Sequence, residues 1–187
     1  AAMLDIADDR RAVLTADLLT DGVHFQLDQV DARRAGRKAL AVNLSDLAAM
    51  AARPRAVLIS LALPRADAAR LARELFEGLI PLAKEFDVAI AGGDTNTWEH
   101  PLAIAVTAVG ETLDQGPWRR TTARPGDVLV VTGELGGSLL GHHLDFTPRV
   151  HEALSIAEQF DVHAAIDVSD GLALDLHRLA SASGCAA

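Results

Sequence analysis

Short aliphatic runs alternate along the chain with longer segments in which apolar residues recur every three or four positions. The runs are rich in branched residues and predict buried strands, at 11–19, 56–64, 88–91, 101–112, 128–132 and, more briefly, 164–168. The longer segments predict amphipathic helices, at 32–52, 66–86, in two pieces over 136–160, and over 171–183 with its end at Gly184. This alternation predicts an α/β or α+β fold.

Glycine and proline set the expected boundaries of these elements. The Arg53-Pro54 pair is expected to end the first helix, and Pro81 to kink or split the second. Gly92 and Gly93 predict a turn after the third strand. A composition shift between Thr132 and Gly141 divides the chain into a domain at 1–131 and the beginning of a second at 132–187.

Composition narrows the classes of function. Half of the 187 residues are hydrophobic, and the formal charge of −9 argues against a general nucleic-acid binder. That charge still permits a nucleotide ligand, since a divalent cation can bridge carboxylates and phosphates. The single cysteine, Cys185, excludes an internal disulfide and favours a cytoplasmic location. No apolar stretch approaches the roughly 20 residues of a membrane span. The missing initiator methionine suggests a fragment.

Carboxylates follow three of the predicted strands. Asp17, Asp94 and the pair Asp167 and Asp170 each stand at a strand end, and strand ends can gather at one edge of a sheet. Mg²⁺ prefers such oxygen ligands, completed by substrate phosphates. Asp46 lies in an otherwise apolar helix, where an unpaired buried carboxylate is costly. The sequence therefore suggests a site for magnesium and phosphate.

Each of these features also has a structural interpretation. Gly92 and Gly93 could form an ordinary turn, Ser169 or Asp170 could cap a helix, and Asp46 could face solvent. The neighbouring histidines, His142 and His143, are expected to be surface or subunit-contact residues, because adjacent residues on a helix point apart. No phosphate-binding P-loop and no nucleophile elbow is present.

Five ordered motifs give the chain a family resemblance. They are TADLLTDGVHF, KALAVNLSDLAAM, AGGDT, RRTTARPGDVLVVTG and AAIDVSDGLALDLHRLASASGC. With these motifs the chain resembles the thiamine-monophosphate kinases, within the aminoimidazole-ribonucleotide-synthetase-related, PurM-like superfamily. The resemblance covers nearly the whole chain.

The resemblance implies a fold, an activity and a set of site residues. It implies a PurM-like N-terminal domain with a mixed sheet and flanking helices, a homodimer with a β-barrel-like interface, and the start of a second α/β domain. It implies phosphoryl transfer from ATP to thiamine monophosphate with Mg²⁺. The metal positions carried over are Thr15, Asp17, Asp46, Asp94, Asp167 and Asp170; nucleotide contacts are Gly93, Asp94, Arg120 and Ser169; His24 contacts the substrate; Asp170 and Arg120 are the catalytic pair. Without the resemblance, Arg120 and His24 could be ordinary surface residues.

Three positions depart from the family pattern. Thr97 stands where arginine is common, Ala51 where a glycine usually ends the helix, and Ala16 where threonine or serine is usual. The family's GDDA motif is expected before Ala1. Another ATP-dependent enzyme of the superfamily and a non-catalytic nucleotide-binding or dimerisation module are the alternative functions.

Overall fold

A five-stranded mixed sheet forms the centre of the computed structural model, which describes residues 2–7 and 10–185. The strand order is β1 (Ala2–Ala7), β2 (Arg10–Thr20), β5 (Ala103–Thr112), β3 (Ala52–Pro64) and β4 (Ala89–Trp98). Only β3 and β4 pair in parallel; the other neighbours are antiparallel. The sheet stays open, with β1 and β4 at its edges. The predicted α/β class and mixed sheet are confirmed.

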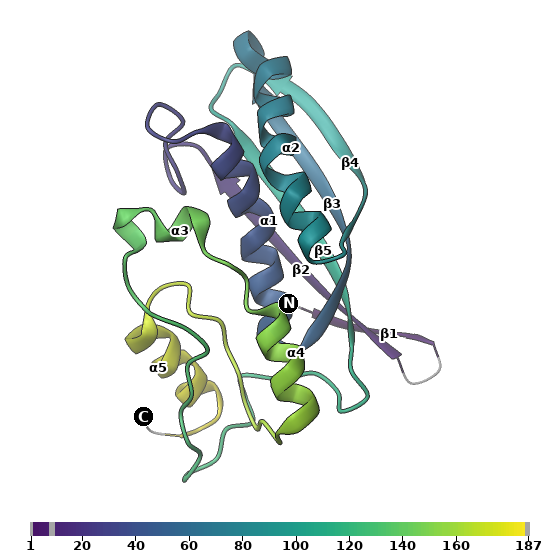
Figure 1. The fold of residues 1–187 in the computed structure, drawn as a ribbon, viewed down its shortest axis with the longest axis vertical. Coiled ribbons are helices and arrows are strands. Elements are labelled where there is room, and N and C mark those ends of the chain that lie inside the picture. The colour runs from purple at the N-terminus through teal and green to yellow at the C-terminus, as the bar shows by residue number, and fades with distance from the viewer. Residues whose placement is uncertain (1, 8–9, 186–187) are drawn as a thin grey trace.

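Two long helices, α1 (Ala32–Ala49) and α2 (Ala68–Glu85), lie next to each other over one face of the sheet (Figure 1). Strand β3 alternates buried and exposed residues, because successive side chains point to opposite faces. Its buried residues meet the apolar stripe of α1, and together they form the core: Val57, Ile59, Leu61, Leu63, Leu40, Leu44 and Leu47. The opposite face of the sheet carries no helix in Figure 1.

The two helices approach each other closely through glycine. A Cβ atom at Gly36 of α1 would lie 2.1 Å from the carbonyl oxygen of Leu75. A Cβ atom at Gly78 of α2 would lie 1.8 Å from the carbonyl oxygen of Arg33. Both positions therefore exclude every residue with a side chain, since real Cβ contacts do not fall below 3 Å.

The proline predictions were partly wrong. Helix α1 already ends at Ala49, followed by Ala51 with φ of 48°, and Pro54 lies within β3. Pro54 is tolerated there because β4 pairs with β3 only from Ala56 onward, so no neighbour needs its missing N–H on that side. Helix α2 runs through Pro81 without being split; the exposed ring removes one hydrogen bond from a long helix.

The remainder of the chain is mostly short helices and irregular segments. They are η1 (Arg65–Asp67), η2 (Ser138–Leu140), α3 (His142–Asp145), α4 (Val150–Gln159) and α5 (Leu172–Ala182). Both α3 and α4 contact α1. The two-piece helical region is confirmed, as is the helix end at Gly184, whose φ is 69°.

Three local predictions were wrong. The segments 128–132 and 164–168 are not strands, because neither has a ladder partner among the described residues; Val128 and Val130 are 86% and 73% exposed. Gly92 and Gly93 do not form a turn, because β4 passes straight through both.

No helix within residues 2–7 and 10–185 is long and apolar enough to cross a membrane. The division into domains at residue 132 stays a prediction.

Candidate functional site

Four of the predicted metal positions come together between the sheet and α1. Thr15 and Asp17 lie on β2, two residues apart, and so point to the same face, toward α1. The hydroxyl of Thr15 donates a hydrogen bond to the carboxylate of Asp46 on α1. Asp167 reaches the same place from the segment before α5, since its charge and that of Asp46 influence each other. We call Thr15, Asp17, Asp46 and Asp167 the acidic group.

The carboxylates of the acidic group repel one another. Burial raises the pKa of Asp167 to about 6, and the charges of Asp46 and Asp175 add to the rise. Burial also raises the pKa of Asp17, with Asp46 contributing, while the nearby His24 acts in the opposite direction. Among the ion pairs of the described residues, none joins a lysine or arginine to these three carboxylates. Such a group favours a cation.

The ligand atoms of the acidic group are of the type that Mg²⁺ prefers. The group offers hard oxygen atoms only, from carboxylates and a hydroxyl, and no lysine or arginine of the described residues forms an ion pair with its carboxylates. Within the described part of the chain, no three acidic or histidine side chains are already arranged to hold a metal ion. Mg²⁺ usually takes one or two carboxylates and keeps water or phosphate oxygens as its other ligands.

The loop at 169–171 is shaped by a residue that sequence reasoning missed. Asp175, only 1% exposed, accepts hydrogen bonds from the backbone N–H groups of Ser169 and Asp170, at 3.0 and 2.8 Å. Arg178 bonds to both Asp175 and Asp170. The capping alternative for Ser169 and Asp170 is wrong, since Gly171 is the N-cap and no side chain caps α5. The sequence could have pointed to this pair, because Asp175 and Arg178 are three residues apart and such side chains are neighbours on a helix.

Arg120 lies on an exposed segment that runs beside the approach to Asp167. The amide of Ala165 donates to the carbonyl of Arg119 at 3.2 Å. The hydroxyl of Ser183, at the end of α5, donates to the carbonyl of Arg120 at 3.0 Å. In the described part of the chain no carboxylate forms an ion pair with the Arg120 side chain. The guanidinium is therefore available to a ligand.

Gly93 and Asp94 lie on β4, and the structure does not bring Asp94 to the acidic group. In the register of the sheet, Asp94 is paired with Ser60 of β3. The same row of paired residues continues across β5 to Leu18 of β2. That row faces away from the helices, whereas Asp17, next to Leu18, faces toward them. Gly93 is required for packing: a Cβ there would lie 1.7 Å from the carbonyl oxygen of Ile59. A metal or nucleotide role for either residue stays a prediction from the resemblance.

His24 occupies an exposed loop at the end of β2. Its Nδ1 atom accepts a hydrogen bond from the amide of Thr20 at 3.0 Å, so the neutral ring carries its proton on Nε2. Lys38, which sequence reasoning missed as a candidate, donates to the carbonyl of His24 at 2.8 Å. The sequence could have pointed to Lys38, because it is a lysine within the motif KALAVNLSDLAAM in a chain rich in arginine.

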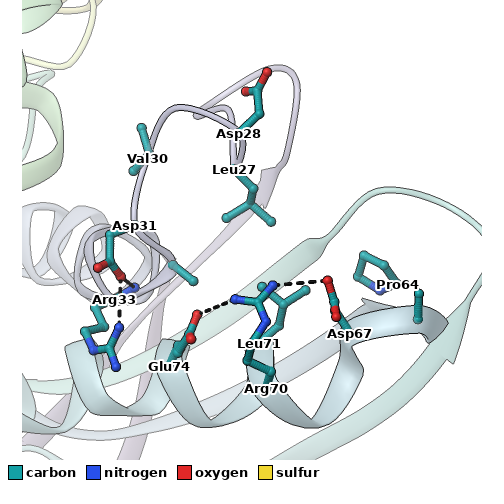
Figure 2. A pocket seen from close by; sticks show the side chains of 12 residues that line it. Leu27, Asp28, Val30, Asp31, Arg33, Pro64, Asp67, Arg70, Leu71 and Glu74 are labelled. Atoms are coloured by element: carbon teal, nitrogen blue, oxygen red, sulfur yellow. Dashed lines mark hydrogen bonds and ion pairs between the residues drawn. The ribbon is translucent and has the colours of Figure 1, made fainter.

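A cleft of about 530 Å³ lies elsewhere, between the loop before α1 and the beginning of α2. Figure 2 shows most of the charged side chains at this cleft paired with one another, while Asp28 stands apart from them. Arg70 bridges Asp67 and Glu74, and Arg33 bonds to Asp31. The cleft shares no residue with the acidic group. We therefore place the candidate site at the acidic group.

Residues 1–112 match the family model of the AIR synthase related protein, N-terminal domain. The chain belongs to this family. It is also 49% identical over 173 residues to the thiamine-monophosphate kinase of Rhodopirellula baltica, covering 92% of this chain and 54% of the relative. This member of the AIR synthase related family thus spans between about half and two thirds of the length of the relatives it matches.

Solved structures give the same assignment. The thiamine monophosphate kinase of Aquifex aeolicus superposes with a TM-score of 0.85 at 30% identity, covering 95% of this chain and 66% of that one. AaThiL complexed with AMPPCP and TMP gives a TM-score of 0.83 at 28% identity, covering 98% and 63%. The predicted recognition and fold are confirmed by these similarities.

Proposed function

We propose that the protein transfers the γ-phosphoryl group of ATP to thiamine monophosphate and so forms thiamine diphosphate, with Mg²⁺ as cofactor. The acidic group is the observation that carries the proposal, because its unpaired carboxylates match a chemistry in which two anionic phosphates must meet. The similarity to AaThiL complexed with AMPPCP, an ATP analogue, and TMP supports both substrates.

Each part of the site contributes binding or positioning. Asp17, Asp46 and Asp167, with Thr15, would hold Mg²⁺, which when bound neutralises phosphate charge and brings the reacting groups together. The Thr15 hydroxyl orients the carboxylate of Asp46. Since phosphoryl transfer needs little covalent help, positioning of this kind accounts for most of the catalysis.

The remaining roles surround the acidic group. Arg120, exposed and beside the approach to Asp167, would bind phosphate oxygens as a fixed cation. Ser169 and Asp170 lie on a loop that Asp175 holds in place, with Asp170 a further metal ligand and a catalytic residue once Arg178 releases it. Gly93 and Asp94 are proposed nucleotide contacts on the resemblance, Asp94 also as a metal ligand, and His24 would contact the acceptor.

A homodimer and a cytoplasmic location complete the proposal. The face of the sheet opposite the helices exposes Leu18 at 59%, Leu58 at 46% and Trp98 at 39%, which supports a second copy packing there. The free cysteine, Cys185, fits a reducing compartment. The charge of −9 supports the absence of a nucleic-acid partner.

The direct test measures thiamine diphosphate formed by the intact protein from ATP and thiamine monophosphate, with and without a chelator. We expect Asp46→Asn to lower the rate at least about 100-fold, as expected when one charge-stabilising group is lost. The matched control is Asp114→Asn, the same change at an exposed carboxylate. Turnover that survives chelation, or equal rates for the two variants, would reject the proposal.

A further inference from the structure

The segment that carries Arg120 is tied to the segment that leads to Asp167. The amide of Ala165 donates to the carbonyl of Arg119 at 3.2 Å. Ala165 comes two residues before Asp167 in the chain, and the bonded carbonyl belongs to the residue directly before Arg120. The place of Arg120 relative to the acidic group therefore depends on how these two segments are held together.

A tight turn at 124–127 continues the segment that carries Arg120. The amide of Asp127 donates to the carbonyl of Arg124 at 3.1 Å, and the amide of Arg124 donates to the carboxylate of Asp127 at 2.8 Å. Pro125 is followed by Gly126 with φ of 97°, which is the sequence and conformation of a type II turn. The turn therefore keeps Arg124 and Asp127, its two end residues, close together.

His163 bonds to the side chains of both end residues of this turn. Its Nδ1 atom lies 2.8 Å from Oδ1 of Asp127, and its Nε2 atom lies 3.2 Å from a guanidinium nitrogen of Arg124. A guanidinium has no acceptor, so Arg124 donates to Nε2, and the neutral ring donates its Nδ1–H group to Asp127. The hydroxyl of Thr122 also donates to the backbone carbonyl of His163. His163 thus joins the two segments through both ring nitrogens and its backbone.

We propose that His163 is a positioning residue: in its neutral form it holds the 119–127 segment, and with it Arg120, against the segment that leads to Asp167. The inference rests on the proposed function, in which Arg120 binds the phosphates of ATP, and adds His163 to the residues on which that binding depends. Ser183 fixes the same segment from another side, because its hydroxyl accepts from the amide of Ala123 at 3.1 Å.

The charged groups around the ring make its protonation state important. Among the described residues, the ring pairs with Arg124, with Asp127 and, at 3.7 Å, with Asp161. An imidazolium has no acceptor left for Arg124 and repels its charge, whereas both carboxylates still attract it. Protonation therefore breaks one of the two ring bonds, in the range between about pH 5 and 8 where histidine usually gains its proton.

The ring is tested first by NMR on the intact protein without ATP or Mg²⁺. Histidine ring nitrogens are labelled, and the signals of His163 are identified by their loss in His163→Asn. We expect the proton of the His163 ring on Nδ1 at about pH 8. We also expect the amide of Ala165 to exchange faster with solvent in His163→Leu than in the wild type. A ring with its proton on Nε2 overturns the proposal.

Kinetics give the second test. His163→Leu removes both ring bonds and should lower kcat/KM for ATP about 10- to 100-fold, as expected for a misplaced phosphate contact, with less than about a twofold change in the KM for thiamine monophosphate. His163→Asn keeps a donor for Asp127 and loses the acceptor for Arg124, so it should lower kcat/KM for ATP only about threefold. The matched control, His142→Leu at an exposed histidine, should change neither quantity.

The pH dependence separates positioning from a purely structural role. At about pH 8 the wild type should exceed His163→Asn about threefold in kcat/KM for ATP, and at about pH 5.5 the two should be equal, because the protonated ring has also lost Arg124. Asp167, whose pKa is about 6, titrates in both proteins and so cancels in the ratio. A ratio that stays the same at both pH values overturns the proposal.

The outcomes separate this inference from the proposed function. An enzyme that phosphorylates thiamine monophosphate with equal kcat/KM for ATP in the wild type and His163→Leu rejects the positioning role and keeps the function. A protein without that turnover, whose ring carries its proton on Nδ1 and whose Ala165 amide exchanges faster in His163→Leu, rejects the function and keeps His163 as the tie between the segments. If His163→Leu unfolds, judged by its thermal unfolding curve, His163→Asn and the wild-type NMR decide.

Discussion

Removing the charge of Asp167 should make the metal-free protein more stable. Its pKa is raised from 3.8 to about 6, chiefly by burial and then by the negative charge of Asp46. Above about pH 6 the carboxylate is ionised in both the folded and the unfolded chain, and only the folded chain suffers the repulsion. The Asp167→Asn substitution keeps the shape of the side chain and removes that unfavourable term.

The magnitude follows from the pKa. A rise from 3.8 to about 6 corresponds to about 3 kcal/mol between the two protonation states. Asp167 is partly exposed, so solvent screening reduces the expected gain to about 1–2 kcal/mol. The sign depends on pH: because the folded pKa is raised, wild-type stability from this group falls as pH rises from about 4 through about 6. The advantage of Asp167→Asn should therefore be present at pH 8 and nearly absent at pH 4.

Urea unfolding with chelator present, at about pH 8 and about pH 4, measures both values. The control is Asp114→Asn, which should change the free energy of unfolding by less than about 0.5 kcal/mol at either pH. Added Mg²⁺ and ATP should stabilise the wild type more than Asp167→Asn, since the variant loses a proposed ligand. A variant less stable than wild type at pH 8, or a difference equal at both pH values, would refute the reasoning.

Two further predictions concern packing and the 169–171 loop. Gly78→Ala should lower the free energy of unfolding by about 3 kcal/mol or prevent folding, because the new Cβ would meet the carbonyl of Arg33. The control is Ala72→Gly in the same helix, which should lower the free energy of unfolding by only about 1 kcal/mol in the same urea titration. Arg178→Met should lower the free energy of unfolding in the same urea titration, since it leaves the buried carboxylate of Asp175 without its cation. Recovery of most of that stability by Arg178→Lys would support the charge as the cause, whereas equal losses in both variants would contradict it.

Local sequence signals predicted the central fold well. The apolar spacing of Leu40, Leu44 and Leu47 identified the buried stripe of α1, and the aliphatic run before Pro64 identified the interior strand β3. These segments bury their apolar faces against each other, so their periodicity already contains the tertiary arrangement. By contrast, the valines at 128–131 have strand propensity without a partner strand, and propensity alone does not produce a ladder.

The candidate site was predicted by residue type and only partly by position. Asp17, Asp46 and Asp167 lie near one another, but not for the predicted reason: Asp17 lies within β2, and Asp167 follows a segment that is not a strand. Asp94 shows where the argument from strand ends fails, because adjacent residues on strands face opposite sides of a sheet and the register is a long-range property. Lys38 was missed for a related reason: its partners, His24 and His143, come from segments far apart in sequence.

The pairing of the other acids in this chain argues that the acidic group exists for binding. Asp175 is more deeply buried than Asp167, yet Arg178 and two backbone N–H groups compensate its charge. A structural carboxylate is stabilised in that way, since an unpaired buried charge is costly. Asp17 and Asp167 instead retain raised pKa values close to Asp46. A bound cation with its phosphate ligands would supply the compensation that these carboxylates lack in the folded chain.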